Sequence, residues 1–204
     1  MSGITNNTTV NVAISGVGGQ GVLTLAEILA RAAMLDGHNV RVGEIHGMAQ
    51  RGGHVVCTVR IGDQVKGPII DSGEAHLIVG FEPLELLREI HLIRNNGLVI
   101  MNSHVQYPVA VSMGEAEYPK EEDIRKFLGD FTSNILELDA MELAVSAGSS
   151  ISMNIVMLGA IIGSNITPIR KTTALQVIRD SFSKKYEEAN IRAFESGYKL
   201  FMQT

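Results

Sequence analysis

Residues 10–21 read VNVAISGVGGQG, and an apolar pattern of helical spacing follows them. Val10, Val12 and Ile14 alternate with smaller or polar residues, which is typical of a strand. Residues 16–21 have the spacing G-x-G-x-x-G, where glycine permits a sharp reversal and lets backbone N–H groups approach an anion at a helix N-terminus. A strand, a glycine turn and a helix predict the first unit of an α/β domain. The turn residues taken as candidates for binding a cofactor or facing an active site are Gly16, Gly18, Gly19, Gln20 and Gly21.

Strand and helix patterns keep alternating along the rest of the chain. They predict a single Rossmann-like α/β domain with a mostly parallel open sheet and helices on both faces. Residues 55–61 and 64–70 are expected to form an inserted β-hairpin, and a further strand is expected near 109–112. A helix beginning at Glu82-Pro83 is expected to run to about Arg94, and residues 152–163 predict a buried helix. We assign residues 1–9 to a flexible tail and 10–204 to the domain.

Composition limits the classes of function. The net charge is −5 and no basic run is present, which argues against binding of nucleic acid. One cysteine, Cys57, cannot ligate an iron–sulfur cluster without help from another chain. No apolar run reaches the roughly 18 residues of a membrane span, and the polar N-terminus predicts a cytoplasmic protein. Charged residues make up only 19 %, which fits either a well-packed core or a surface covered by a partner, including a homodimer of the isolated chain.

Glu44 offers one interpretation of the glycine turn. It lies 23 residues after Gly21, near the end of the second expected strand, where an acid would bind the ribose of a dinucleotide. That favours a stand-alone dinucleotide-binding Rossmann protein. A glycine turn that simply allows close packing of helix and strand is the alternative, and Gln20 is unusual inside a nucleotide fingerprint.

A second glycine-bounded loop follows Glu44 and reads HGMAQRGG at residues 46–53. Arg51 presents a fork of donors suited to carboxylate or phosphate, and His46 can transfer a proton near neutral pH. Alternatively, His46 caps the strand and Arg51 pairs with Glu44. The loop residues taken as candidates are His46, Gln50 and Arg51 for catalysis, with Gly47, Met48, Gly52 and Gly53 facing the site.

Other polar residues are weaker candidates. Asn102 follows a strand and is expected either to face the site or to serve as a turn residue. His38, His76, His91 and His104 show no common ligand spacing, so no metal site is predicted. We expect Cys57 to be buried as a small apolar residue.

The chain resembles the γ-type subunits of the 2-oxoacid:ferredoxin oxidoreductases, and within them the indolepyruvate type. The resemblance is carried by GVGGQG, by E-x-HGMAQRGG and by Phe81-Glu82-Pro83-Leu84-Glu85, and it extends through Ser152-Met153-Asn154 and Met157-Leu158-Gly159. It covers essentially the whole chain. The octapeptide is the most specific of these motifs.

The resemblance implies a subunit that completes a larger enzyme. The family decarboxylates a 2-oxoacid with thiamine diphosphate, passes two electrons through iron–sulfur clusters to ferredoxin and releases an acyl-CoA. Thiamine diphosphate, Mg²⁺ and [4Fe–4S] clusters are then expected in a large catalytic partner, with CoA as co-substrate and no cofactor bound by this chain alone. The γ subunit of a pyruvate, 2-ketoisovalerate or 2-oxoglutarate enzyme is the alternative within the family, and a non-enzymatic nucleotide-binding or scaffold module is an alternative outside it.

Overall fold

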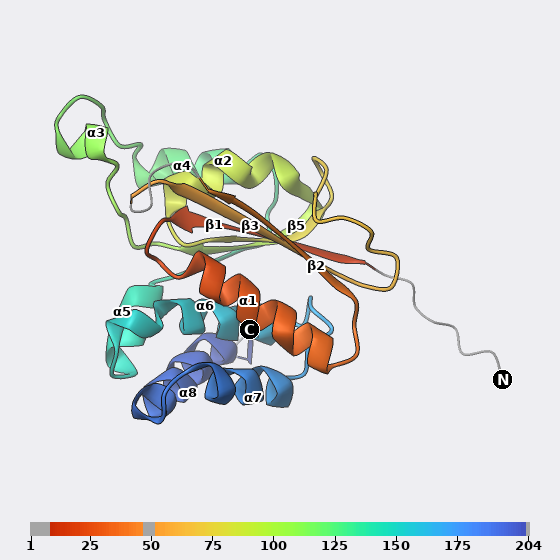
Figure 1. Ribbon diagram of the computed structural model, residues 1–204. Helices are drawn as coiled ribbons and strands as arrows, with labels where there is room; N and C mark the ends of the chain where they lie inside the picture. Colours follow the sequence, from red (N-terminus) through yellow and green to blue (C-terminus); the bar gives the residue numbers. More distant parts are fainter. Residues whose placement is uncertain (1–8, 47–51, 203–204) are drawn as a thin grey trace.

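The protein is built on one six-stranded sheet with the strand order β2-β3-β1-β4-β5-β6 (Figure 1). The computed structural model describes residues 9–46 and 52–202. The strands are β1 (Val10–Val17), β2 (Val40–His46), β3 (His54–Ile61), β4 (Ala75–Gly80), β5 (Ile93–Asn102) and β6 (Ile135–Leu138). β1 is parallel to β4, β4 to β5 and β5 to β6, whereas β3 is antiparallel to both β1 and β2. The prediction of an α/β fold with a mostly parallel open sheet is confirmed.

Helices cover both faces of the sheet (Figure 1). One face carries α2 (Pro83–Glu89) and α4 (Glu121–Gly129), and the short α3 (Val109–Ser112) projects from the same side of the molecule. The other face carries α1 (Val22–Leu35), α5 (Ala140–Ser146), α6 (Met153–Gly163), α7 (Lys171–Ser181) and α8 (Lys184–Lys199). Short 3₁₀ turns η1 (Ile90–Leu92), η2 (Ser150–Ser152) and η3 (Leu200–Met202) join or extend these elements. Within the described ranges, no helix is both long and apolar enough to cross a membrane.

Alternation along the central strands explains the two cores. Successive side chains of a strand point to opposite faces, so Ile14 packs under α1 and α6 while Ala13 packs toward α2. Every residue of α6 is buried, as its strongly apolar sequence predicts. Cys57 is also fully buried, and burial, with a smaller contribution from Glu44, raises the pKa of its thiol to about 12. The expectation that Cys57 is an inert core residue agrees with this environment.

The inserted hairpin at residues 55–70 is not formed. The first expected strand exists as β3, but residues 64–70 contain no strand. Both edges of β3 are already occupied by β1 and β2, so no backbone partner remains for that segment. Its carbonyl groups are instead bound by β3 side chains: Thr58 Oγ1 donates to Pro68 O at 2.7 Å, and Arg60 Nη1 donates to Ile69 O at 2.7 Å.

Two other sequence predictions are wrong. Residues 109–112 form the helical turn α3 instead of a strand, between Pro108 and Gly114 and with no neighbouring strand to pair with. The helix begun at Pro83 ends at Glu89, and Ile93 already pairs with Ala75 in β5. Asn96 has φ 59°, and the pairing of β4 with β5 shifts register here, so Asn96-Gly97 lies in an irregularity of a strand and does not end a helix.

Candidate functional site

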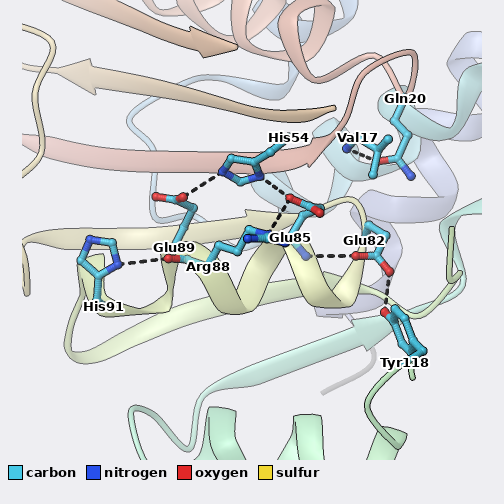
Figure 2. Close-up of polar contacts among 9 residues, drawn as sticks. All are labelled: Val17, Gln20, His54, Glu82, Glu85, Arg88, Glu89, His91 and Tyr118. Carbon is cyan, nitrogen blue, oxygen red and sulfur yellow. Dashed lines mark hydrogen bonds and ion pairs between the residues drawn. The ribbon is translucent and has the colours of Figure 1, made fainter. Parts of the chain in front are cut away.

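The glycine turn lies at the carboxyl end of β1, where it leads into α1. Gly21 is the N-cap of α1 with φ 88°, a conformation that favours glycine. The sequence alone marks Gln20 as unusual inside a nucleotide fingerprint. The structure folds it back, because Gln20 Oε1 accepts from Val17 N at 2.8 Å while Gln20 N donates to Val17 O at 3.1 Å (Figure 2). Gln20 therefore holds the turn closed.

The carboxyl ends of the central strands meet beneath this turn. Phe81 O accepts from Asn102 Nδ2 at 2.9 Å and lies 3.5 Å from Gln20 Nε2. A Cβ on Gly16 would lie 2.8 Å from Phe81 Cβ, so this position requires the absence of a side chain. Asn102 is fully buried and its Oδ1 accepts from Ala140 N at 2.9 Å. It supports the floor of the site from below and has no exposed atom with which to contact a ligand directly.

The two loops found in the sequence meet at the same edge of the sheet. Gly18 N donates to Gly53 O at 2.9 Å, and Gly52 N donates to Gly18 O at 3.4 Å. Gly52 has φ 77°, which favours glycine at the end of the second loop. The structure thus joins the glycine turn to the last two residues of HGMAQRGG. The predicted residues Gly47, Met48, Gln50 and Arg51 lie outside the described residues, as does the side chain of His46.

Glu44 does not occupy the position of a ribose-binding acid. It pairs with Cys57 of β3, and Cys57 in turn pairs with Ile14 of β1. β3 therefore separates Glu44 from the glycine turn by two strand spacings, about 9.5 Å. In a dinucleotide-binding sheet the acid ends the strand adjacent to the first one. The expected placement of Glu44 beside the glycine turn is therefore wrong, because β3 lies antiparallel between β1 and β2.

An ionic cluster supports the second loop from the α2 side, and sequence analysis did not find it (Figure 2). His54 directly follows Gly53; its Nδ1 contacts Glu85 Oε2, and its Nε2 lies 3.0 Å from Glu89 Oε1. Each ring nitrogen of His54 therefore meets one carboxylate of α2. Arg88 Nε adds a contact to Glu85 Oε2 at 3.3 Å. The spacing of Glu85 and Glu89 on one helix face is visible in the sequence, but the approach of His54 depends on how β3 enters the sheet.

A second buried carboxyl, Glu82, caps α2. Glu82 Oε2 accepts from Glu85 N at 3.0 Å, and Tyr118 Oη donates to Glu82 Oε1 (Figure 2). Burial raises the pKa of Glu82, against the opposing effect of these two hydrogen bonds. Burial and the neighbouring Glu82 also raise the pKa of Tyr118.

Glu82 gives the folded protein a pH-dependent stability. Because its pKa is raised on folding, its favourable contribution is complete below the usual glutamate pKa and is lost as pH rises through the raised value. Glu82→Gln mimics the protonated form. Between about pH 4 and pH 8, urea unfolding should show the variant gaining stability relative to wild type. Exposed Glu117→Gln, which removes the same charge, serves as control, and an equal pH trend in both variants would contradict the prediction.

A cavity of about 760 Å³ opens beside the glycine turn. Its walls come from the turn, from residues 104–106 after β5, from residues 149–154 in η2 and the start of α6, and from the first two turns of α8, with Met141 and Phe182 beside them. Among the described residues, no three histidine, cysteine, aspartate or glutamate side chains are grouped to hold a metal ion. The site is thus a polar, glycine-rich edge with an adjoining cavity.

Comparison with known proteins identifies the family. The family model for pyruvate ferredoxin/flavodoxin oxidoreductase matches residues 11–200. The chain belongs to this family. It is 43 % identical to indolepyruvate oxidoreductase subunit IorB of Pyrococcus horikoshii over 93 % of this chain and 94 % of that protein. It is 28 % identical to the common γ subunit of the pyruvate/ketoisovalerate oxidoreductases of Pyrococcus furiosus, over 93 % of this chain and 95 % of that subunit.

A solved structure supports the fold independently. Pyruvate oxidoreductase subunit PORC from Thermotoga maritima superposes with a TM-score of 0.72 at 23 % identity, covering 94 % of this chain and 96 % of that one. At this identity the likeness is evidence for the fold alone. The resemblance found from the sequence motifs, including its indolepyruvate type, is confirmed.

Proposed function

We propose that this chain is the small subunit of an indolepyruvate:ferredoxin oxidoreductase. The observation that carries the proposal is the 43 % identity to IorB over nearly the full length of both proteins. The corresponding identity to the common γ subunit of pyruvate/ketoisovalerate enzymes is 28 %, so those substrates are the second choice. The assembled enzyme would convert an aryl pyruvate and CoA into an aryl-acetyl-CoA and CO₂, passing two electrons to ferredoxin.

In this proposal the chain binds a partner subunit, and the partner carries out the redox chemistry. Its one cysteine is buried, which is consistent with clusters ligated elsewhere. Thiamine diphosphate, Mg²⁺ and [4Fe–4S] clusters are assigned to a large catalytic subunit, and the isolated chain is expected to be inactive. In this proposal His46, Gln50 and Arg51 face that subunit, the CoA or the substrate carboxylate.

Exposed apolar side chains near the two loops are consistent with a covering partner. Ile45, next to the second loop, is 70 % exposed, and Ile151 on the cavity wall is 81 % exposed. Large apolar side chains left in water beside a polar site are typical of a subunit interface. The partner is therefore proposed to cover this edge of the sheet.

The stand-alone dinucleotide-binding function is not favoured. The turn has the right spacing, but Glu44 lies two strands away from it. The sequence similarity is also to enzyme subunits over the whole chain. Binding of NAD or FAD by the isolated chain would revive this alternative.

Anaerobic native purification tests the proposal. We expect the chain to co-purify with a large, brown, thiamine-containing subunit and the complex to reduce ferredoxin with indolepyruvate only when CoA is present. Pyruvate, 2-ketoisovalerate and 2-oxoglutarate should be compared as substrates in the same assay. A chain that purifies alone and colourless would overturn the proposal.

A further inference from the structure

The end of the second loop has little of its own to fix its position. Gly52-Gly53 carries no side chain, and glycine has the largest backbone freedom of any residue. These two residues reach the glycine turn through two backbone hydrogen bonds with Gly18, at 2.9 and 3.4 Å. His54 follows them as the first residue of β3 and pairs with Val17, the last residue of β1. Because the ends of elements fray most readily, the position of Gly52-Gly53 depends on what holds His54.

The imidazole of His54 is held through both of its nitrogens by α2 (Figure 2). Nδ1 contacts Glu85 Oε2, and Nε2 lies 3.0 Å from Glu89 Oε1. A ring turned over about its Cβ–Cγ bond would place carbon atoms against both oxygens, so the two contacts together select one ring orientation. The side chains of Glu85 and Glu89 are only 8 % and 17 % exposed, and shielding from water strengthens polar contacts of this kind.

The helix that carries the two carboxylates is a firm anchor. Leu86 is fully buried, and a Cβ on Gly80 would lie 2.5 Å from Leu86 Cβ, so α2 packs closely on the end of β4. Glu82 caps the helix by accepting from Glu85 N at 3.0 Å, and Tyr118 Oη donates to Glu82 in turn (Figure 2). His54 is therefore bound to a part of the fold whose position is set by its own packing.

The contacts of His54 lie outside the cavity but are connected to its wall. Gly18 lines the cavity, whereas His54, Glu85 and Glu89 are not among its lining residues. The connection is short, since Gly53 directly precedes His54 and its carbonyl accepts from Gly18 N. A shift of His54 would thus reach the glycine turn through one residue and one hydrogen bond.

We propose that His54 is a positioning residue of the site. Together with Glu85 and Glu89 it forms a clamp that fixes Gly52-Gly53 against Gly18, and so sets the shape of the edge where the two loops meet. The effect of the clamp on the loop end is a property of this chain alone. Its effect on turnover rests on the proposed function.

Hydrogen exchange of the full chain, followed residue by residue by NMR, tests the clamp. In His54→Leu, which removes both contacts, the Gly18 amide should exchange about tenfold faster than in wild type. His91→Leu is the matched control, because His91 is exposed near the same helix and its ring contacts only the backbone carbonyl of Arg88. Val79, fully buried in β4, reports on global opening and should exchange at the wild-type rate in both variants.

His54→Asn separates the two contacts. The amide nitrogen of asparagine stands one bond beyond Cγ, as Nδ1 does, so this variant can keep the contact with Glu85 and loses the one with Glu89. Exchange at Gly18 should then be intermediate. Equal exchange at Gly18 in His54→Leu and His91→Leu would overturn the inference, and so would an equal acceleration at Val79, which would mean a general loss of stability.

Kinetics of the reconstituted complex separate positioning from simple stabilisation. A clamp that only stabilised the fold would lower the amount of assembled complex and leave kcat per complex unchanged. A positioning clamp should lower kcat per complex several-fold in His54→Leu, with partial recovery in His54→Asn and none of this loss in His91→Leu. An unchanged kcat per complex in His54→Leu would contradict the role in turnover. If no partner is found at all, the proposed function fails, while exchange at Gly18 still tests the clamp.

Discussion

Replacing Gly197 with alanine is expected to lower the free energy of unfolding by about 3 kcal/mol or more, because the backbones of α6 and α8 are in direct contact. A Cβ at Gly197 would lie 1.9 Å from Val156 O and 2.9 Å from Ala160 N. These are backbone atoms, so no rotamer change can relieve the overlap, and the helices must separate. Urea unfolding followed by circular dichroism measures the loss.

The contact is reciprocal along the two helices. A Cβ at Gly159 would lie 2.1 Å from Phe194 O, so α6 also presents glycine to the α8 backbone. The helices support the cavity as well, since Ser152, just before α6, donates to Asn190 of α8 at 2.6 Å. Separation of α6 from α8 should therefore disturb both the core and the wall of the cavity beside the glycine turn.

Gly129 provides the matched control. It is the last residue of α4 and is exposed, and a Cβ there would have no neighbour within 4 Å. Gly129→Ala should be neutral or stabilise by up to about 1 kcal/mol, because alanine is the better helix former. If Gly197→Ala proves as stable as Gly129→Ala, the close approach of α6 and α8 is wrong.

The sequence predicts local structure well where one segment determines it. The alternation in β1 and the strongly apolar sequence of α6 each suffice to predict an element. The need for glycine at Gly159 and Gly197 could not be predicted, because it arises from a contact between helices far apart in sequence. Glycine within a helical pattern is by itself a destabilising choice, and that is the one signal available beforehand.

The sheet order explains the larger errors. The glycine turn and Glu44 fit a parallel dinucleotide-binding unit, but β3 returns antiparallel between β1 and β2 and moves Glu44 outward. The same insertion occupies both edges of β3, which leaves residues 64–70 without a partner strand. It also brings His54 to Glu85, a contact between residues 31 positions apart in the chain. Strand order is a long-range property that local periodicity does not contain.

Replacing Arg51 with alanine is expected to reduce ferredoxin reduction by the reconstituted complex about 100-fold, with assembly preserved. Arg51 directly precedes Gly52 in the sequence. The Gly52 N–H donates to Gly18 O at 3.4 Å, so the described end of this loop meets the glycine turn at the sheet edge where the partner is proposed to bind. A guanidinium binds a carboxylate or phosphate through two parallel hydrogen bonds, which orients the bound group as well as neutralising it. Arg51→Lys retains the charge without this geometry and should give an intermediate rate.

Arg41→Ala is the matched control for Arg51. Arg41 is exposed near the opposite end of β2, and its Nη1 donates to Val40 O at 2.8 Å, so its loss changes the charge of the chain equally without touching the two loops. Steady-state rates at varied CoA and indolepyruvate, with size-exclusion chromatography of each complex, separate the outcomes. A raised KM for CoA alone assigns Arg51 to the co-substrate, a raised KM for indolepyruvate alone assigns it to the substrate carboxylate, and a lowered kcat with both KM values unchanged assigns it to a step after binding. Unchanged rates and unchanged assembly in Arg51→Ala would show that the guanidinium has no role at this edge, and HGMAQRGG would then act through its glycines.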